Sequence, residues 1–378
     1  MPLIPLPQRQ VVMPTTQPSP PVPPAQLGLT PTPPLDIPIS SSLLLLFILA
    51  ATTHMTIFQL NRRRSHKFLF SALLFGFCMA RIASLVMRIV WATRPTNTGI
   101  ALAATIFVAA GVLLLYIVNL VFAQRVLRAY RPRIGWNKTL GWAWKGLFGS
   151  VVAVLVMVVT ATVVGMMSSD LGVRQKTREV QLFAGVYMAV LAVSPVVVVA
   201  GAVFWPGGGG NNKVDKFGQG RMRSKIFLLV GSSLLLTLGA AFRAGIGFMP
   251  RLVTDPAWYH SKPAFYCLNF GIELVVVYGY AVARFDKRFH VPDGSSGPGD
   301  YGRGAVVVNK EEEVFGGGDS EGQSHGGEGV MNNSWGQSRS RSRGREMAEG
   351  DGVTGERPES LVLVEAVLQN GLKKKAVV

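Results

Sequence analysis

The sequence predicts an all-α membrane protein, built as a bundle of seven transmembrane helices with disordered N- and C-terminal tails. Three observations predict this class. Hydrophobic residues make up 49% of the chain and charged residues only 16%, against about 25% in an average soluble domain. Seven apolar segments are each about as long as the roughly 20 residues that a membrane-crossing helix needs. Basic residues flank these segments, as the orientation of membrane helices requires.

We expect three parts along the chain. Residues 1–36 contain PSPPVPPA and LTPTPP, whose proline rings favour an extended, disordered arm. Residues 37–290 form the seven-helix domain. Residues 291–378 are rich in Gly, Ser, Glu and Arg and cannot bury enough apolar surface to offset the entropy of ordering, so we expect a disordered tail. The expected spans are residues 39–60, 68–91, 99–122, 147–167, 182–205, 225–248 and 265–283.

The first three spans are joined by short turns. Only residues 61–67 separate the first two, and so few residues require an antiparallel pair. The second span, 68–91, is apolar but carries Arg81 near its middle and Arg88 near one end. The third contains AATIFVAAG, whose small residues allow neighbouring backbones to approach closely.

The remaining spans differ in composition. The fourth is rich in valine, yet about 20 unbroken apolar residues exceed the length of a strand. The fifth contains Pro195, which removes one helical hydrogen bond. Residues 206–223 include GGGGNN, which lacks the lysine of a phosphate loop and indicates a flexible linker. The sixth span carries Arg243, and the seventh carries Asn269 and Glu273, the one carboxylate within the expected spans.

The positive charge belongs to the membrane domain. Residues 1–283 hold 25 Lys and Arg against 6 Asp and Glu, whereas residues 284–378 hold 13 against 15. This distribution argues against nucleic-acid binding. With seven spans, 17 basic residues fall on one side and 7 on the other. The positive-inside rule then places the N-terminus outside the cytosol and the C-terminus in the cytosol, in the plasma membrane or an endomembrane.

Charged residues within the spans are the candidate site. A guanidinium at the bilayer centre costs about 2.5 to 3.5 kcal/mol, so such residues face the bundle interior and find partners. The four charged side chains can meet in the outer half of the bundle, and we hypothesise an outward-opening basic pocket for a ligand, built on Arg81, Arg243 and Glu273. The alternative is a structural salt bridge with Arg88 reaching the interface. The predicted ligand-binding residues are Arg81, Arg88, Arg243, Asn269 and Glu273.

Signals for catalysis are weak. The chain has no HExxH motif, no metal-spaced Cys/His cluster and no dinucleotide fingerprint. Residues 318–322 match G-x-S-x-G formally, but they lie in low-complexity sequence rather than at a strand-to-helix turn. We therefore expect no enzyme, no cofactor and no metal.

Several long motifs resemble a known family. They are HMTIFQLNRRRSHKF, FGFCMARIASLVMRIVWATRP, FGQGRMRSKI, GAAFRAG, PAWYHSKPAFYCLNFGIELVVVYGYA and FDKRFHVPDG. Over residues 38–295 the chain resembles a fungal group of seven-span membrane proteins catalogued as a domain of unknown function. It is more loosely similar to fungal lipid-translocating exporter-like proteins, in which Phe242, Arg243 and Glu273 would correspond to a Phe-Arg pair and a glutamate.

The leading functional prediction is binding or movement of a lipid or amphipathic small molecule, with membrane lipids and an anionic ligand as partners. The first alternative is a receptor that signals through basic loops and a cytosolic tail. The second is a structural membrane protein without a ligand. Deleting the tail should abolish the response of a receptor, whereas a lipid handler should fail when Arg81 or Glu273 is changed.

Overall fold

The computed structural model of the chain describes residues 25–63, 68–204, 214–292 and 295–302. Every regular element in these ranges is a helix, and seven helical segments there are long and apolar enough to cross a membrane. The expected seven-helix bundle is therefore confirmed. Six spans are single helices: α1 (Pro33–Arg63), α2 (Phe70–Thr93), α3 (Thr98–Tyr130), α5 (Lys138–Met167), α6 (Leu171–Phe204) and α7 (Met222–Phe248).

The seventh span consists of three consecutive helical pieces. α8 (Lys262–Phe265) leads into a π-helical turn, η2 (Tyr266–Gly271), and α9 (Ile272–Val282) completes the span. A π-helical turn closes its hydrogen bonds over five residues instead of four, and such turns are frequent at functional sites. Among the described residues outside the spans, α4 (Pro132–Gly135) and the 3-10 turn η1 (Trp258–His260) lie in connections, and α10 (Phe285–Arg288) follows the seventh span.

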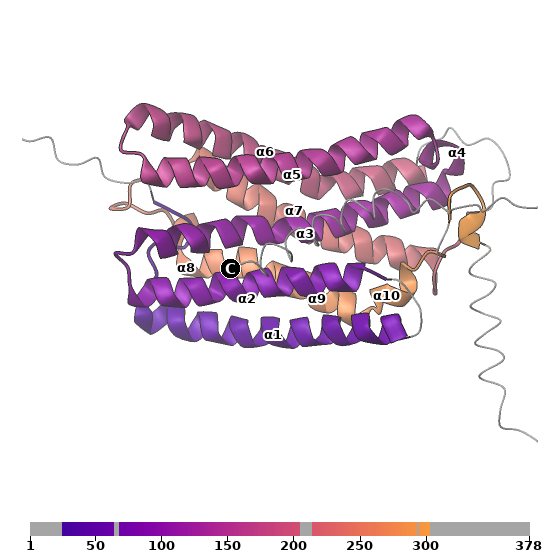
Figure 1. Cartoon of the computed structure of the whole chain (residues 1–378), viewed down its shortest axis with the longest axis horizontal. Coiled ribbons are helices and arrows are strands. Elements are labelled where there is room, and N and C mark those ends of the chain that lie inside the picture. The colour runs from indigo at the N-terminus through magenta and orange to yellow at the C-terminus, as the bar shows by residue number, and fades with distance from the viewer. Residues whose placement is uncertain (1–24, 64–67, 205–213, 293–294, 303–378) are drawn as a thin grey trace, which may run out of the picture.

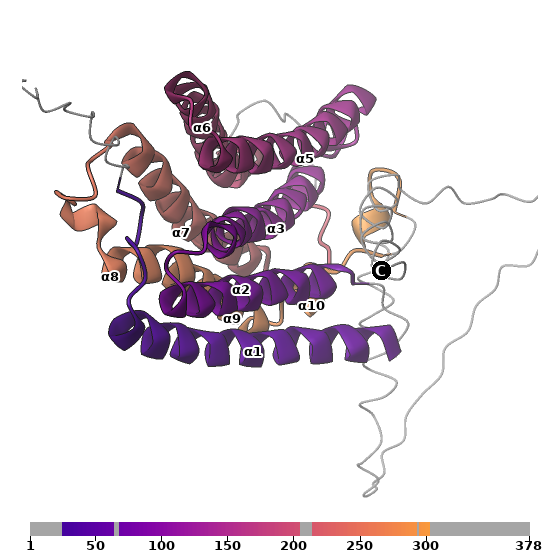
Figure 2. The same cartoon turned by 60° about the vertical axis from the view of Figure 1, so that its left-hand side comes forward.

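The helices form an elongated bundle (Figure 1). α5 and α6 pack together on one flank, α1 and α2 pack together on the opposite flank, and α3 lies between them (Figures 1 and 2). α3 and the seventh span have the largest buried share of the seven spans. They form the centre of the bundle, so polar side chains on them are the ones that must find partners inside the protein.

Two helix starts follow directly from the local sequence. The Asn97 side chain accepts hydrogen bonds from the backbone N–H groups of Gly99 and Ile100, at 3.1 and 3.2 Å. Asn137 accepts one from the N–H of Thr139 at 3.0 Å. The first turn of a helix leaves its N–H groups without partners, and asparagine is a preferred residue to satisfy them. These caps place the starts of α3 and α5.

The N-terminal arm is shorter than expected. We predicted an extended arm through residue 36, but α1 already begins at Pro33, and residues 25–32 lie against the loop that precedes the seventh span. The backbone N–H of Ala25 donates to the carbonyl of Arg251 at 2.7 Å. The part of the predicted arm at residues 1–24 lies outside the described residues.

Gly28 holds this segment against the bundle. Its N–H donates to the carbonyl of His260 at 3.0 Å. Its φ of +79° is in the left-handed region, and an added Cβ would lie 2.6 Å from the Phe265 ring. Only glycine combines that backbone conformation with so close an approach. The segment is therefore part of the folded domain and not a free tail.

Parts of the expected linker and tail also pack. Phe217 belongs to the linker predicted at residues 206–223, and Tyr301 belongs to the tail predicted at 291–378. Both are buried, with ring centroids 5.6 Å apart. They close the end of the bundle, where burial of their rings removes apolar surface from water. Within these two predicted segments, residues 206–213, 293–294 and 303–378 lie outside the described residues.

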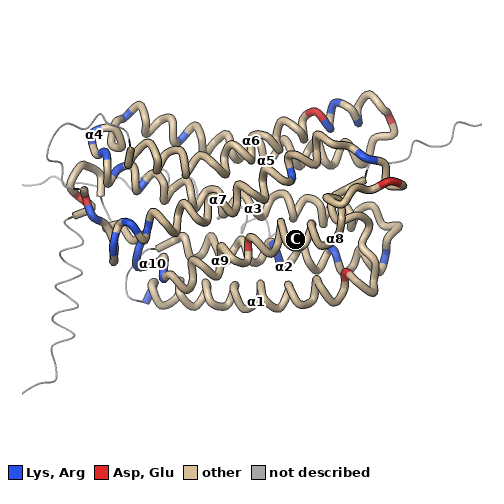
Figure 3. The backbone as a smooth tube through the Cα atoms, turned by 180° about the vertical axis from the view of Figure 1, so that it is seen from behind, with Lys and Arg blue, Asp and Glu red and all other residues tan. Residues whose placement is uncertain are grey.

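The two ends of the bundle differ in charge. Lys and Arg gather at the end that holds α4 and α10 (Figure 3). We call it the basic end. The opposite end holds α8 and the junction between α5 and α6, and it contains the loop before the seventh span.

Candidate functional site

An arginine–glutamate pair lies inside the bundle. Arg81 on α2 donates from Nε and Nη2 to the two carboxylate oxygens of Glu273 on α9, at 2.5 Å each. Its Nη1 donates to the Val108 carbonyl on α3 at 2.8 Å. Gly111 leaves the room for this approach, because an added Cβ would lie 3.3 Å from the guanidinium carbon. Arg81 is fully buried and Glu273 is 1% exposed, so the two charges neutralise each other in a closed, bidentate contact.

A second cluster surrounds Asp36, in the first turn of α1. Arg88 donates to its Oδ1 from Nη2 at 3.0 Å, Lys262 donates to Oδ2 at 2.6 Å, and the Tyr266 hydroxyl donates to Oδ1 at 2.7 Å. The Arg88 guanidinium also lies 4.2 Å from the centroid of the Phe265 ring. Asp36 is fully buried. Two cations share one carboxylate, so this cluster carries one net positive charge.

Arg243 on α7 has a different environment. Its Nη1 donates to the Asn269 side-chain oxygen at 2.7 Å, and its Nη2 donates to the Tyr116 hydroxyl on α3 at 2.8 Å. Both partners are neutral, and within the described residues no carboxylate forms an ion pair with Arg243. The side chain is half-buried. Of the three arginines predicted for the site, Arg243 alone lacks a carboxylate partner in the part of the chain that the structure describes.

The π-helical turn η2 directs the residues that contact Arg88 and Arg243 toward different helices. It carries Tyr266 and Asn269, and Glu273 follows in the first turn of α9. In an unbroken α-helix, residues three and four apart lie on one face. The wider turn changes that register. Tyr266 contacts Arg88 on α2, whereas Asn269 contacts Arg243 on α7.

The structure divides the predicted site into separate contacts. Arg81 meets Glu273, and Arg243 meets Asn269. Arg88 does not join them, because it is 4% exposed and bonded to Asp36 in a separate cluster. In the structure Arg88 therefore lies in a different cluster from the Arg81–Glu273 pair. Ligand binding by the five residues stays a prediction.

Sequence reasoning missed Asp36. We counted one carboxylate in the spans because we expected the first span to begin at residue 39, whereas α1 begins at Pro33 and includes Asp36 in its first turn. An acidic residue three positions before a predicted span was the available signal. Tyr116, Lys262 and Tyr266 were missed as well, and no pattern in the sequence distinguishes them from other interfacial or core residues.

His260 is a buried polar residue in the loop before the seventh span. His260 is 1% exposed, and burial lowers its pKa below the usual value. Its two ring nitrogens have no hydrogen-bond partner within the described residues. Burial therefore favours the neutral form of the imidazole. In the described residues no group of three His, Cys, Asp or Glu is arranged to hold a metal ion.

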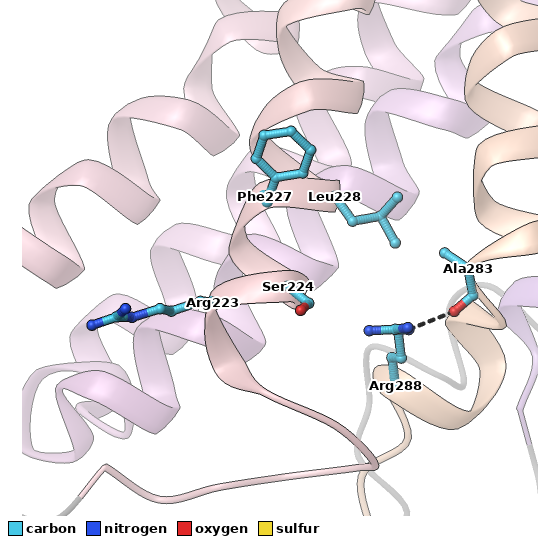
Figure 4. Close-up of a pocket in the computed structure, with 6 residues that line it drawn as sticks. All are labelled: Arg223, Ser224, Phe227, Leu228, Ala283 and Arg288. Atoms are coloured by element: carbon cyan, nitrogen blue, oxygen red, sulfur yellow. Dashed lines mark hydrogen bonds between the residues drawn. The ribbon is translucent and has the colours of Figure 1, made fainter.

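Two cavities lie at the basic end of the bundle, away from these arginines. Their volumes are about 420 and 330 Å³, and none of the five predicted site residues lines either one. Figure 4 shows the larger cavity, between the start of α7 and the end of α9.

The chain was compared with protein families, curated proteins and solved structures. Residues 211–290 match a family model described as "Protein of unknown function (DUF3112)". The expected resemblance to a membrane family of unknown function is confirmed over this region. No curated protein and no solved structure matches the chain. The looser similarity to lipid-translocating exporter-like proteins therefore stays a prediction.

The matched region includes α7 and the seventh span. It thus contains Arg243, Asn269 and Glu273 but neither Arg81 nor Arg88. Residues 211–290 carry both partners of the Arg243–Asn269 contact and the acid that neutralises Arg81. The Arg81–Glu273 pair consequently joins the matched region to α2, which lies outside that region.

Proposed function

We propose that this multi-pass membrane protein binds an anionic amphiphile, whose charged group lies against Arg243. The observation that supports the proposal is that Arg243 forms no ion pair with a carboxylate in the described residues, whereas Arg81 and Arg88 each do. A charge held among neutral groups in a membrane is costly, and the residues that carry such charges usually mark binding sites or transport pathways. A bound anion would offset that cost.

The position of Arg243 suits an amphiphile. It lies five residues before the end of α7 at Phe248, which corresponds to about 8 Å along the helix axis. A lipid headgroup or the carboxylate of a fatty acid can reach that depth from the membrane surface, with its apolar part remaining in the bilayer. Arg81 is unsuited to the same role because Glu273 and the Val108 carbonyl already occupy its guanidinium.

Replacing Arg243 by glutamine tests the proposal. Glutamine keeps a hydrogen-bond donor for Asn269 or Tyr116 but removes the charge. A hydrogen bond to a charged group contributes about 1.5 to 3 kcal/mol, so we expect the amount of anionic lipid or fatty acid that copurifies to fall about tenfold or more. Mass spectrometry of lipids bound to the purified full-length protein measures this.

Arg251→Gln is the matched control. Arg251 lies on the same end of the bundle in an exposed pair with Asp255, at 3.5 Å, and its replacement should leave the copurifying lipids unchanged. If Arg243→Gln retains the wild-type lipids while folding normally, the proposal fails. Arg243 would then be a structural link between α7, α3 and the seventh span, as a protein without a ligand would use it.

We also propose that the basic end faces the cytosol. The gathering of Lys and Arg at that end supports this orientation (Figure 3), because basic loops resist translocation. The test uses a Cys267→Ser background, since Cys267 is the exposed native cysteine. A membrane-impermeant thiol reagent added outside intact cells or sealed vesicles should label Ser169→Cys, between α5 and α6. It should label Thr139→Cys, at the start of α5, only after permeabilisation, and the reverse pattern would refute the orientation.

A further inference from the structure

The two cavities at the basic end are adjacent, and we treat the pair as one groove. They share Ala283 and Arg288, and they lie between the first turns of α7 and the junction of α9 with α10 (Figure 4). Their combined volume exceeds that of a few water molecules by a wide margin. We call this the α7–α10 groove. The residues that line it are Gln219, Gly220, Arg223, Ser224, Phe227, Leu228, Val282, Ala283, Arg284, Lys287 and Arg288.

The α7–α10 groove has an excess of positive charge. Four of its lining residues are basic and none is acidic; the excess charge comes from Lys287 and Arg288, because Arg223 points away and Arg284 pairs with Asp286. Beside the groove Asp286 is buried and accepts hydrogen bonds from Arg284 and Asn61. Within the described residues Lys287 has no ion-pair partner. The groove therefore offers cationic groups that the described part of the protein does not neutralise.

The backbone is shaped to present these cations. Arg284 has a φ of +47°, in the left-handed region that costs an L-residue roughly 1 to 2 kcal/mol. This turn ends α9 and starts α10, so it directs the following residues back toward α7. Arg288 donates from Nε to the Ala283 carbonyl at 2.6 Å, and another nitrogen of its guanidinium faces Ser224 across the cavity (Figure 4). Only the part of Arg223 nearest the backbone lines the cavity, because its exposed side chain points away from it (Figure 4).

The flank of the groove is apolar. Phe227 is 81% exposed and Val282 is 83% exposed, although both belong to membrane-spanning helices. Phe227 lies five residues after the start of α7, about 8 Å along the axis, so it is just inside the apolar layer when Arg284 and Lys287 are at its surface. A site with cations at the interface and apolar side chains beside them fits a molecule with an anionic head and an acyl tail.

We propose that the α7–α10 groove binds an anionic phospholipid, with the headgroup phosphate against Lys287 and Arg288 and an acyl chain along Phe227 and Val282. This site is separate from Arg243, at the opposite end of the bundle, and does not depend on the function proposed there. Basic pockets between transmembrane helices recognise phospholipid headgroups by this combination of charge and position. The groove makes the protein sensitive to the lipid composition of the leaflet at its basic end.

Titration of the purified full-length protein in detergent tests the site. The probe is a short-chain phosphatidylinositol phosphate, and the readout is the ligand-dependent rise in melting temperature, from which an apparent Kd follows. Each basic residue near a headgroup strengthens binding about fivefold, so Lys287→Gln/Arg288→Gln should weaken binding roughly thirtyfold. Lys287→Gln alone, which removes no hydrogen bond of the described fold, should weaken it about fivefold.

The matched control is Arg133→Gln/Lys138→Gln. It removes the same charge from exposed residues at the same end of the bundle, outside the groove, and should leave the Kd within about twofold. Two further probes identify the ligand: inorganic phosphate and a short-chain phosphatidylcholine should each bind far more weakly. The proposal is overturned if the control weakens binding as much as the groove variants, if phosphatidylcholine binds equally well, or if free phosphate matches the phospholipid.

Discussion

Replacing Glu273 by leucine is expected to destabilise the protein by about 3 to 5 kcal/mol, the largest effect of any single substitution proposed here. Arg81 would keep its charge, fully buried, with backbone carbonyls and the rings of Phe77 and Phe270 as its remaining partners but no counter-charge. The cost of an uncompensated buried charge dominates the loss of the hydrogen bonds themselves. Reversible unfolding of the purified protein in detergent, or its melting temperature, measures the change.

The double variant Arg81→Met/Glu273→Leu separates charge from packing. Since it removes both charges and fills the space with apolar side chains, it should recover most of the stability lost in Glu273→Leu. Arg251→Ala is the control, because its pair with Asp255 is exposed and contributes at most about 1 kcal/mol. A double variant as unstable as the single one would show that the loss at Glu273 does not come from the unpaired Arg81 charge.

Replacing Asp36 by asparagine should have the second largest effect, about 3 kcal/mol. Asparagine has nearly the same shape, but it removes the negative charge that Arg88 and Lys262 share. The loss of stability should appear first near the cluster, because residues 25–32 and the start of α1 are attached to the rest of the bundle through it. We expect backbone hydrogen exchange at residues 25–36 to accelerate more than at α3.

Asp255→Asn is the matched control for this prediction. Asp255 lies in the loop before the same span and pairs with Arg251, but it is exposed, so its replacement should change neither melting temperature nor exchange measurably. Uniformly faster exchange over the whole bundle in Asp36→Asn would contradict a local role. Unchanged exchange at residues 25–36 would contradict the attachment itself.

The buried arginines show where sequence reasoning succeeded. Arg81 and Glu273 were both predicted as site residues, because charges in apolar segments require partners and few were available. The structure places them in direct contact. Arg243 and Asn269 were also named, and they are hydrogen bonded. The identity of these residues could be predicted because a charge within an apolar segment is visible in the sequence without any knowledge of neighbouring helices.

Arg88 shows where that reasoning stopped. Its partner Asp36 lay three residues outside the expected first span, and the contact between them joins α1 to α2. No local pattern reports such a contact. The groove at the basic end could not be predicted either, since residues 219–228 and 282–288 come together only through the packing of α7 against α9.

The number and type of the spans are properties of the amino-acid order alone. An apolar segment of sufficient length must satisfy its own backbone hydrogen bonds inside a bilayer, and a helix does so without help from the rest of the chain. Which arginine meets which partner was decided by the folded bundle. The π-helical turn η2 changes the register of the seventh span, and the early start of α1 introduces Asp36. Asp36 then meets Lys262 and Tyr266, which lie more than 200 residues further along the chain, and hydrophobic periodicity does not encode such contacts.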